Sequence, residues 1–374
     1  MGAGIAQLAL EAGHEVVLHD VDADALERGN GRIRAGLERR AAKLELDADS
    51  IDAWVDGRLG GLREAHTLDA VAAEADVIIE AAVEDLGLKQ TIFRALDGGA
   101  GPDVLLATNT SALSVAAIAA ATTRPERVIG LHFFNPAVVM RLVEVVAPAG
   151  AAPEAVVRGV TLVESWDKRA VRCADVPGFI VNRVNRPFTL EALAMLEAGE
   201  TSAVTIDAAI RSAGFPMGPF ELMDLVGIDV NLAAARGIWE GLGRPERLRP
   251  SPIQEQLVDA GRLGRKTGRG FYLYADGTPP AIDPAFDAGA GLDEATIVDR
   301  IRLAIVNEAW RALGDAIATA PDIDLALRLG AAHPVGPFEW TSGVGGPQAV
   351  TSRLAALSEH GARFEPAPAL AATA

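Results

Sequence analysis

With 374 residues, 49% of them apolar, the chain is long enough to bury two or three hydrophobic cores, so we expect a globular protein. The formal net charge of −17 at pH 7 excludes a nucleic-acid-binding surface, and the single cysteine, Cys173, excludes an internal disulfide or a thiol pair for a metal. Because apolar runs of membrane-spanning length and a secretory signal are both absent from the sequence, we expect a cytoplasmic protein with no membrane partner and no metal.

The first twenty residues predict a helix followed by a strand. Gly2 and Gly4 open an apolar run with helical spacing, Gly13 ends it, and residues 15–20 form a buried strand that closes with Asp20. In a dinucleotide-binding βαβ unit such a helix follows a strand and a glycine-rich turn, and the closing acid binds the ribose hydroxyls. Only the end of that turn is present, so we expect a βαβ unit whose first strand is missing.

Short runs of Val, Ile and Leu then alternate with helical stretches as far as about residue 175. The predicted strands cover residues 76–80, 104–107, 128–132 and 142–146. This alternation is typical of an α/β sheet. Four consecutive hydrogen-bonding side chains follow the second of these strands, at residues 108–111, and they either bind a ligand or form a turn.

A histidine and a glutamate stand out among the later strands. His132 ends a predicted buried strand, where ligands bind in open α/β sheets. Glu144 interrupts an apolar strand, where an unpaired carboxylate is costly to bury. An imidazole is its natural partner, and a His–Glu pair makes a general base near neutral pH. We therefore predict this pair, although a structural role suits Glu144 equally well; the other histidines are expected to be structural.

From Pro177 onward, apolar residues at helical spacing predict a mostly helical region. GPFE at 218–221 returns at 336–339, and IVNR at 180–183 returns as IVDR at 297–300, which indicates an internal duplication. Asn182 becomes Asp299 in the second copy, so packing alone does not require the amide. The expected domains are 1–175, 176–275 and 296–357, with a linker at 276–295 and a tail at 358–374.

Several motifs, in their order and spacing, resemble those of the long-form 3-hydroxyacyl-CoA dehydrogenases with a duplicated C-terminal domain, a group that includes bacterial 3-hydroxybutyryl-CoA and 3-hydroxyadipyl-CoA dehydrogenases. The motifs are MGAGIA, IIEAAVEDLGLKQ, ATNTSALS, HFFNP followed by LVEVV, DVPGFIVNR and GRKTGRGFY, and the resemblance runs from Met1 to about Val344. It implies an α/β Rossmann-like NAD-binding domain, with the first strand missing, followed by an all-α C-terminal region made of two repeated helical domains.

The resemblance also implies roles in catalysis. His132 would take the proton from the C3 hydroxyl of a (S)-3-hydroxyacyl-CoA while hydride passes to NAD, and Glu144 would orient its imidazole. Ser111 and Asn182 would contact the reacting oxygen, and Asn135 would line the substrate site. The implied setting is fatty acid β-oxidation or a related acyl-CoA pathway, such as phenylacetate or butanoate metabolism, and a homo-oligomer is compatible with it.

Binding roles are implied for the remaining matched residues. The expected cofactor-binding residues are Gly2, Asp20, Glu84 and Lys89, and the acid at Asp20 favours NAD over NADP because a 2′-phosphate would meet a like charge. Arg40 and Lys43 are implied to contact the phosphates of CoA, although a solvated helix face is an equal alternative. The basic stretch at 262–269 is expected to be a basic turn.

The match begins inside the glycine-rich turn, at the third glycine. A start codon assigned too far downstream would produce this chain, and we expect a chain without the strand to fold poorly and to bind NAD weakly. Two other functions stay open from the sequence. One is a non-catalytic acyl-CoA-binding or assembly protein, and the other is a dehydrogenase of a free hydroxy acid or sugar acid.

Overall fold

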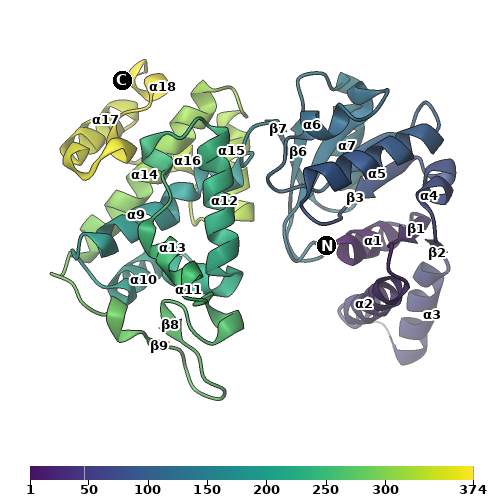
Figure 1. Ribbon diagram of the computed structural model, residues 1–374, viewed down its shortest axis with the longest axis horizontal. Helices are drawn as coiled ribbons and strands as arrows, with labels where there is room; N and C mark the ends of the chain where they lie inside the picture. The colour runs from purple at the N-terminus through teal and green to yellow at the C-terminus, as the bar shows by residue number, and fades with distance from the viewer. Residues whose placement is uncertain (46, 374) are drawn as a thin grey trace. The chain divides into compact units, whose positions relative to one another are not determined.

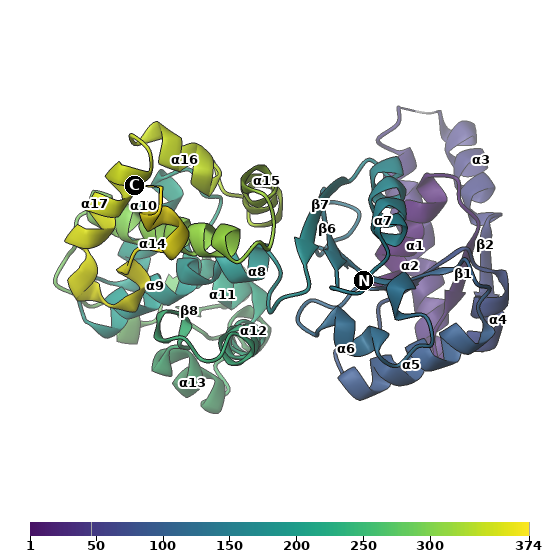
Figure 2. The same ribbon diagram turned by 90° about the horizontal axis from the view of Figure 1, so that it is seen from above.

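The computed structural model describes residues 1–45 and 47–373. It divides into two compact units, Met1–Asp175 and Val176–Ala374, whose elements are labelled in Figures 1 and 2. Among the described helices, none is both long and apolar enough to cross a membrane.

The first unit is an α/β domain with two sheets. A parallel pair, β1–β2, forms one sheet, and the other has the order β3–β4–β5–β6–β7, in which only β5 and β6 are antiparallel neighbours. The strands are β1 (Val16–His19), β2 (Leu62–Ala65), β3 (Val77–Glu80), β4 (Leu105–Thr108), β5 (Val128–Phe133), β6 (Leu142–Ala147) and β7 (Arg169–Ala174). All five predicted strands are confirmed, whereas β2 and β7 were not predicted.

The two sheets share a core although, among the described residues, no strand of one pairs with a strand of the other. Val16 of β1 packs against the same apolar cluster as Val77 and Ile79 of β3. These three residues are half-buried, whereas every residue of β4 and β5 is buried.

Helices cover both faces of these sheets. Figure 2 shows α1 and α7 on one face and α4, α5 and α6 on the other. The helices are α1 (Gly2–Glu11), α2 (Ala23–Ala41), α3 (Ala48–Leu59), α4 (Leu68–Glu74), α5 (Leu86–Gly99), α6 (Val115–Ala119) and α7 (Pro153–Ser165). Parallel strands with helices on both faces form the Rossmann-like arrangement that the sequence predicts.

The second unit is helical around the long helix α14 (Glu294–Gly314), which packs against α9, α10, α16 and α18. Its other helices are α8 (Val181–Val184), α9 (Arg186–Glu197), α10 (Ala203–Ser212), α11 (Pro219–Val226), α12 (Ile228–Gly241), α13 (Pro252–Asp259), α15 (Ala320–Gly330), α16 (Pro337–Gly343), α17 (Pro347–Ala356) and α18 (Pro368–Ala371). A short hairpin joins β8 (Tyr272–Leu273) to β9 (Ala281–Ile282).

Contacts in the second unit recur about 117 residues apart. Asp207 accepts hydrogen bonds from the amides of Phe220 and Glu221, at the start of α11. Asp324 accepts the corresponding bonds from Phe338 and Glu339, at the start of α16. In both copies the aspartate therefore caps the helix that the GPFE motif begins.

Ion pairs join the buried helix α14 to its neighbours α8 and α9. Arg183 Nε donates to Glu308 at 2.9 Å, and Arg300 Nε donates to Glu191 at 2.9 Å. A second arginine contacts each glutamate at 2.8 Å, Arg247 on Glu308 and Arg363 on Glu191. Each glutamate is thus held by two arginines, in a reciprocal arrangement.

The segment 276–295 was expected to be a linker because it is rich in Pro and Gly. It is instead packed into the second unit, which corrects that expectation. Its buried Asp283 accepts hydrogen bonds from Arg262 at 2.6 Å and from Arg269 at 2.9 Å. Lys266 pairs with Asp229. The two bonds to Asp283 hold the segment in place, and the basic turn at 262–269 remains a prediction.

The expected tail at 358–374 is also part of the core. Phe364 and Leu370 are fully buried in the apolar cluster that includes Leu303 of α14. The Asn307 amide donates to the carbonyl oxygen of Glu365 at 2.7 Å and fixes the backbone there. The short apolar spacing of this segment lacks a helical period, which is why the sequence did not predict its docking.

The buried carboxyl group of Asp207 makes the stability of the second unit depend on pH. Burial raises its pKa to about 7 from 3.8, against the hydrogen bonds it accepts. The folded state therefore binds an extra proton between about pH 4 and pH 7, and the free energy of unfolding falls as pH rises through this window, by on the order of 4 kcal/mol. We expect urea denaturation of Asp207→Asn to show a flatter pH dependence than the native chain. Parallel curves for the two proteins would contradict this.

Candidate functional site

The predicted His–Glu pair is present in the first unit. His132 and Glu144 lie directly opposite each other across the antiparallel strands β5 and β6, which explains their spacing. His132 Nδ1 is 2.6 Å from Glu144 Oε2, and the two residues are 6% and 0% exposed. Because a carboxylate only accepts hydrogen bonds, Nδ1 carries the proton of the neutral imidazole and Nε2 carries none.

The polar run after β4 is attached to the end of β5. Asn109 Oδ1 accepts a hydrogen bond from the Phe133 amide at 2.8 Å, next to His132. Ser111 follows in the same turn and is exposed. The turn therefore places a serine hydroxyl at the carboxyl ends of adjacent parallel strands, near the histidine.

Glu84 organises this turn. Its Oε1 accepts hydrogen bonds from the Thr110 hydroxyl at 2.6 Å, from the Ser111 amide at 2.8 Å and from the Ala112 amide at 3.1 Å. Burial opposes ionisation, but these bonds together with Lys89 hold the pKa of Glu84 below its ordinary value. Glu84 is thus a charged acceptor that fixes the backbone around Ser111.

Lys89 lies beneath this network rather than at a surface. It is 1% exposed, and its Nζ contacts Glu80 at 2.7 Å and Glu84 at 3.5 Å. Glu80 also accepts a hydrogen bond from the Thr108 hydroxyl at 2.7 Å. A direct contact between Lys89 and a cofactor, as the resemblance implies, does not fit this burial. Its position suits a supporting role through the two glutamates.

A buried lysine holds the loop that follows His132. Lys168 Nζ donates to the carbonyl oxygens of Ala137 at 2.7 Å and Met140 at 3.0 Å, and burial lowers its pKa. Asn135 lies exposed in this loop, before a cis peptide bond to Pro136. The loop that presents Asn135 is therefore fixed from its far end.

The remaining sites predicted for the first unit lie near α1 and β1. Asp20 is exposed directly after β1, and Gly2 begins α1, which has no acidic residue in its first turn and no side-chain cap. Arg40 is exposed at the end of α2, 3.6 Å from Glu11, and Lys43 is exposed just beyond it. The positions of Asp20 and Gly2 are compatible with dinucleotide binding. Those of Arg40 and Lys43 are compatible with either a solvated helix face or a contact with phosphate.

Asn182 belongs to the second unit, where it is the half-buried second residue of α8. The sequence predicts a helix that begins at Pro177 and Gly178. Gly178 and Phe179 instead have φ angles of 80° and 47°, so the helix begins at Val181. The left-handed backbone delays the helix and places the amide in its first turn rather than one turn further in.

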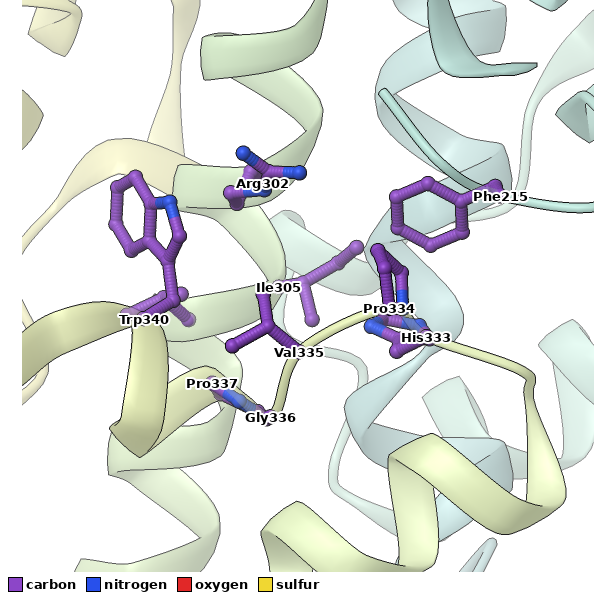
Figure 3. A pocket seen from close by; sticks show the side chains of 10 residues that line it. Phe215, Arg302, Ile305, His333, Pro334, Val335, Gly336, Pro337 and Trp340 are labelled. Atoms are coloured by element: carbon purple, nitrogen blue, oxygen red, sulfur yellow. The ribbon is translucent and has the colours of Figure 1, made fainter. Parts of the chain in front are cut away.

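A small pocket in the second unit is shown in Figure 3, with His333 and Phe215 at one end and Trp340 at the other. Its volume of about 10 Å³ has room for one water molecule at most. Burial, with Arg302 nearby, lowers the pKa of His333 to about 3, and its Nε2 is 2.8 Å from Asn185 Oδ1. His333 is a neutral structural residue, as expected.

Comparison with known proteins agrees with this geometry. Residues 1–176 match the family described as 3-hydroxyacyl-CoA dehydrogenase, NAD binding domain, and residues 178–274 and 297–373 match its C-terminal domain. The chain belongs to the 3-hydroxyacyl-CoA dehydrogenase family. Its first unit is accordingly the NAD-binding domain of an NAD-dependent oxidoreductase family.

Three members of this dehydrogenase family show the extent of the similarity. The 3-hydroxyadipyl-CoA dehydrogenase of Escherichia coli (strain K12) is 36% identical, over 92% of this chain and 89% of the relative. The mitochondrial hydroxyacyl-coenzyme A dehydrogenase of Rattus norvegicus is 41% identical, over 73% and 88%. A crystal structure of 3-hydroxybutyryl-CoA dehydrogenase from Escherichia coli K12 is 35% identical and matches 100% of this chain and 96% of its own with a TM-score of 0.89.

Sequence reasoning on this dehydrogenase missed the residues that support the site. Glu80, Asn109 and Lys168 were not predicted as site residues, yet each holds a segment next to a predicted one. The only sequence signal was polarity inside apolar surroundings, as in the run at 108–111. The contacts join distant elements, so spacing along the chain does not reveal them.

Proposed function

We propose that this chain oxidises a (S)-3-hydroxyacyl-CoA to the 3-oxoacyl-CoA with NAD as hydride acceptor. The observation that carries the proposal is the buried His132–Glu144 pair at 2.6 Å in an NAD-binding domain of this family. An acyl-CoA substrate is supported by the names of relatives, which include 3-hydroxyadipyl-CoA and 3-hydroxybutyryl-CoA dehydrogenases.

The chain's own residues account for the proton transfer. His132 Nε2 takes the proton of the C3 hydroxyl, and the imidazolium that forms is stabilised by the carboxylate of Glu144. The Ser111 hydroxyl and the Asn182 amide donate hydrogen bonds to the reacting oxygen as charge develops on it. Asn135, on the loop held by Lys168, lines the substrate site.

The cofactor fits residues at the edge of the first unit. Asp20 would accept hydrogen bonds from the ribose hydroxyls, and the N-terminal end of α1 at Gly2 favours an anion such as pyrophosphate. Glu84 follows Ala81, which lies against Gly2, by three residues. When bound, NAD accepts the hydride from C3. Arg40 and Lys43 are exposed cations that would meet the phosphates of CoA.

We further propose that the second unit contains two copies of one helical fold, packed on each other as two subunits would be. The reciprocal pairs Arg183–Glu308 and Arg300–Glu191 support this arrangement. The second copy would then replace a partner subunit, and the chain is expected to sediment as a monomer. A dimer formed through the helical unit would contradict this.

The test of the function is NADH oxidation with acetoacetyl-CoA, measured beside free acetoacetate. We expect turnover of the thioester and at least about 100-fold lower kcat/KM for the free acid. A preference for the free acid would favour a hydroxy-acid or sugar-acid dehydrogenase. Tight binding of acetoacetyl-CoA without turnover would favour an acyl-CoA-binding protein.

Loss of the Glu84 carboxylate should act through Ser111. Glu84→Ala leaves the turn at 109–112 without its acceptor, and we expect kcat to fall by about 10- to 100-fold because the serine hydroxyl is misplaced. If Glu84 only positions Ser111, the double variant with Ser111→Ala will be no slower than Ser111→Ala alone. Additive losses in steady-state kcat would assign Glu84 a separate contact.

A further inference from the structure

A groove lies between α15 and α16, in the second copy of the sequence repeat, and is called the α15–α16 groove below. It has a volume of about 510 Å³, a size typical of ligand pockets. The residues that line it include Asp324, Arg328, Phe338, Glu339 and Ser342. Since none of the candidate-site residues lines it, the groove is separate from the proposed chemistry.

The corresponding face of the first copy, between α10 and α11, is covered by the β8–β9 hairpin. The Tyr272 hydroxyl donates to Asp207 Oδ2 at 2.7 Å, and the ring centroids of Phe271 and Phe220 are 4.7 Å apart. Burial and the nearby carboxylate of Asp207 raise the pKa of Tyr272, so its hydroxyl stays protonated and donates. A tyrosine and the aromatic residue before it therefore fill this face of the first copy.

The repeat relates the lining of the α15–α16 groove to the residues beneath that hairpin. The offset is 117 residues before the GPFE motif and 118 from the motif onward, and the corresponding pairs are Asp207 and Asp324, Arg211 and Arg328, Phe220 and Phe338, Glu221 and Glu339, and Asp224 and Ser342. Asp207 and Phe220 are completely buried, whereas Asp324 is 8% exposed and Phe338 is half-buried. The second copy thus keeps the same side chains and leaves them partly open to solvent.

Asp324 can accept a hydroxyl group as Asp207 does. Its Oδ2 accepts the amide of Glu339 at 3.0 Å, and the matching oxygen of Asp207 accepts both an amide and the tyrosine hydroxyl. A carboxylate oxygen has room for both bonds. Because Arg328 pairs with Glu339 at 3.1 Å, the ionised carboxylate of Asp324 gives the groove a net negative charge, which disfavours an acidic occupant.

The occupant has to come from another molecule. Both tyrosines of the chain, Tyr272 and Tyr274, lie in the hairpin of the first copy, so the described residues supply none to the groove. The hairpin backbone is held by Asp224, which accepts the amides of Phe271 and Tyr272. Its counterpart Ser342 has no carboxylate. The second copy therefore keeps the part of the site that receives a tyrosine side chain and lacks the part that anchors a hairpin of this chain.

We propose that the α15–α16 groove binds a tyrosine side chain in an extended, neutral or basic segment of a partner protein. The tyrosine hydroxyl donates to Asp324 Oδ2, and an apolar residue before the tyrosine covers Phe338, as Tyr272 and Phe271 do in the first copy. The proposal uses the repeat and the groove, and it does not depend on the proposed dehydrogenase activity.

The test is an NMR titration of the full chain with the peptide of residues 268–273, GRGFYL, whose single tyrosine is Tyr272. We expect a Kd below about 1 mM. The same peptide with Tyr272→Phe should bind at least about tenfold more weakly, because a hydrogen bond to a charged acceptor is lost. Phosphorylation of the tyrosine should abolish binding, since the phosphate would meet the carboxylate of Asp324.

Two matched variants locate the binding. Ser342→Trp places a large side chain at the groove and should remove binding of the tyrosine peptide, whereas Ser352→Trp, at an exposed position of α17, should leave it unchanged. Both variants replace an exposed serine, so both should keep the fold. If the peptide instead displaced the hairpin of the first copy, the two variants would bind it equally well.

Four results would overturn the proposal. They are a native chain that does not bind the tyrosine peptide, equal affinity for the tyrosine and phenylalanine peptides, equal affinity of the two tryptophan variants for the tyrosine peptide, and binding of p-cresol as tightly as the peptide. The last result would assign the groove to a small phenol instead of a protein segment.

Discussion

Replacement of Glu144 by glutamine is expected to lower kcat for 3-hydroxyacyl-CoA oxidation by about 10²- to 10⁴-fold. The carboxylate accepts the Nδ1 proton of His132 at 2.6 Å and so fixes the tautomer in which Nε2 is the base. A glutamine amide can donate to Nδ1 and favour the opposite tautomer, and it does not stabilise an imidazolium. Because the side chains are nearly the same size, the strand pair β5–β6 should stay intact, with little change in Tm.

Steady-state kinetics can separate this role from a structural one. The loss should appear in kcat, with KM for the acyl-CoA changed by less than about threefold, since neither residue of the pair is expected to hold the CoA. A His132→Asn, Glu144→Gln double variant should be no slower than His132→Asn alone, because Glu144 acts only through the imidazole. Glu126→Gln, an exposed site in the same unit, is the matched control. A glutamine variant with native kcat would show that Glu144 is structural.

Three of the five strands that the sequence predicted, β4, β5 and β6, are buried along nearly their whole length. Residues 128–133 and 142–147 are apolar apart from His132 and Glu144, because β5 and β6 lie inside the sheet. The missed strand β7 (Arg169–Ala174) lies at the edge of its sheet and alternates buried with exposed residues, two of them arginines. Its pattern therefore resembles a surface segment, and only pairing with β6 makes it a strand.

In the candidate site too, charged residues whose partners lie on distant elements were hard to predict from the sequence. The pairing of His132 and Glu144 was predictable because each interrupts an apolar strand and each has one natural partner. The position of Lys89 was not predictable, since its two partners are Glu80 at the end of β3 and Glu84 in the turn that follows.

Loss of Arg300 is expected to destabilise the second unit more than any surface change. Its guanidinium contacts the fully buried Glu191, which otherwise keeps only Arg363 among the described residues. Breaking a buried pair from one side typically costs about 3–5 kcal/mol because the other charge stays buried. Arg300→Met should therefore lower Tm by roughly 6–20 °C for a unit of this size. Thermal unfolding followed by circular dichroism measures this loss.

Removal of both Arg300 and Glu191 should reverse most of this loss of Tm. An Arg300→Met, Glu191→Leu double variant removes the fully buried carboxylate that Arg300 leaves behind. Arg363 and Glu200, the other partners of this pair, are partly exposed and can turn to solvent. Such replacement of a buried pair by apolar residues is often neutral or stabilising. Arg353→Met removes an exposed pair with Asp299 and should change stability by less than about 1 kcal/mol. If the double variant is as unstable as Arg300→Met, the loss comes from packing between α9 and α14, and the ion pairs do not stabilise the association of the two helices.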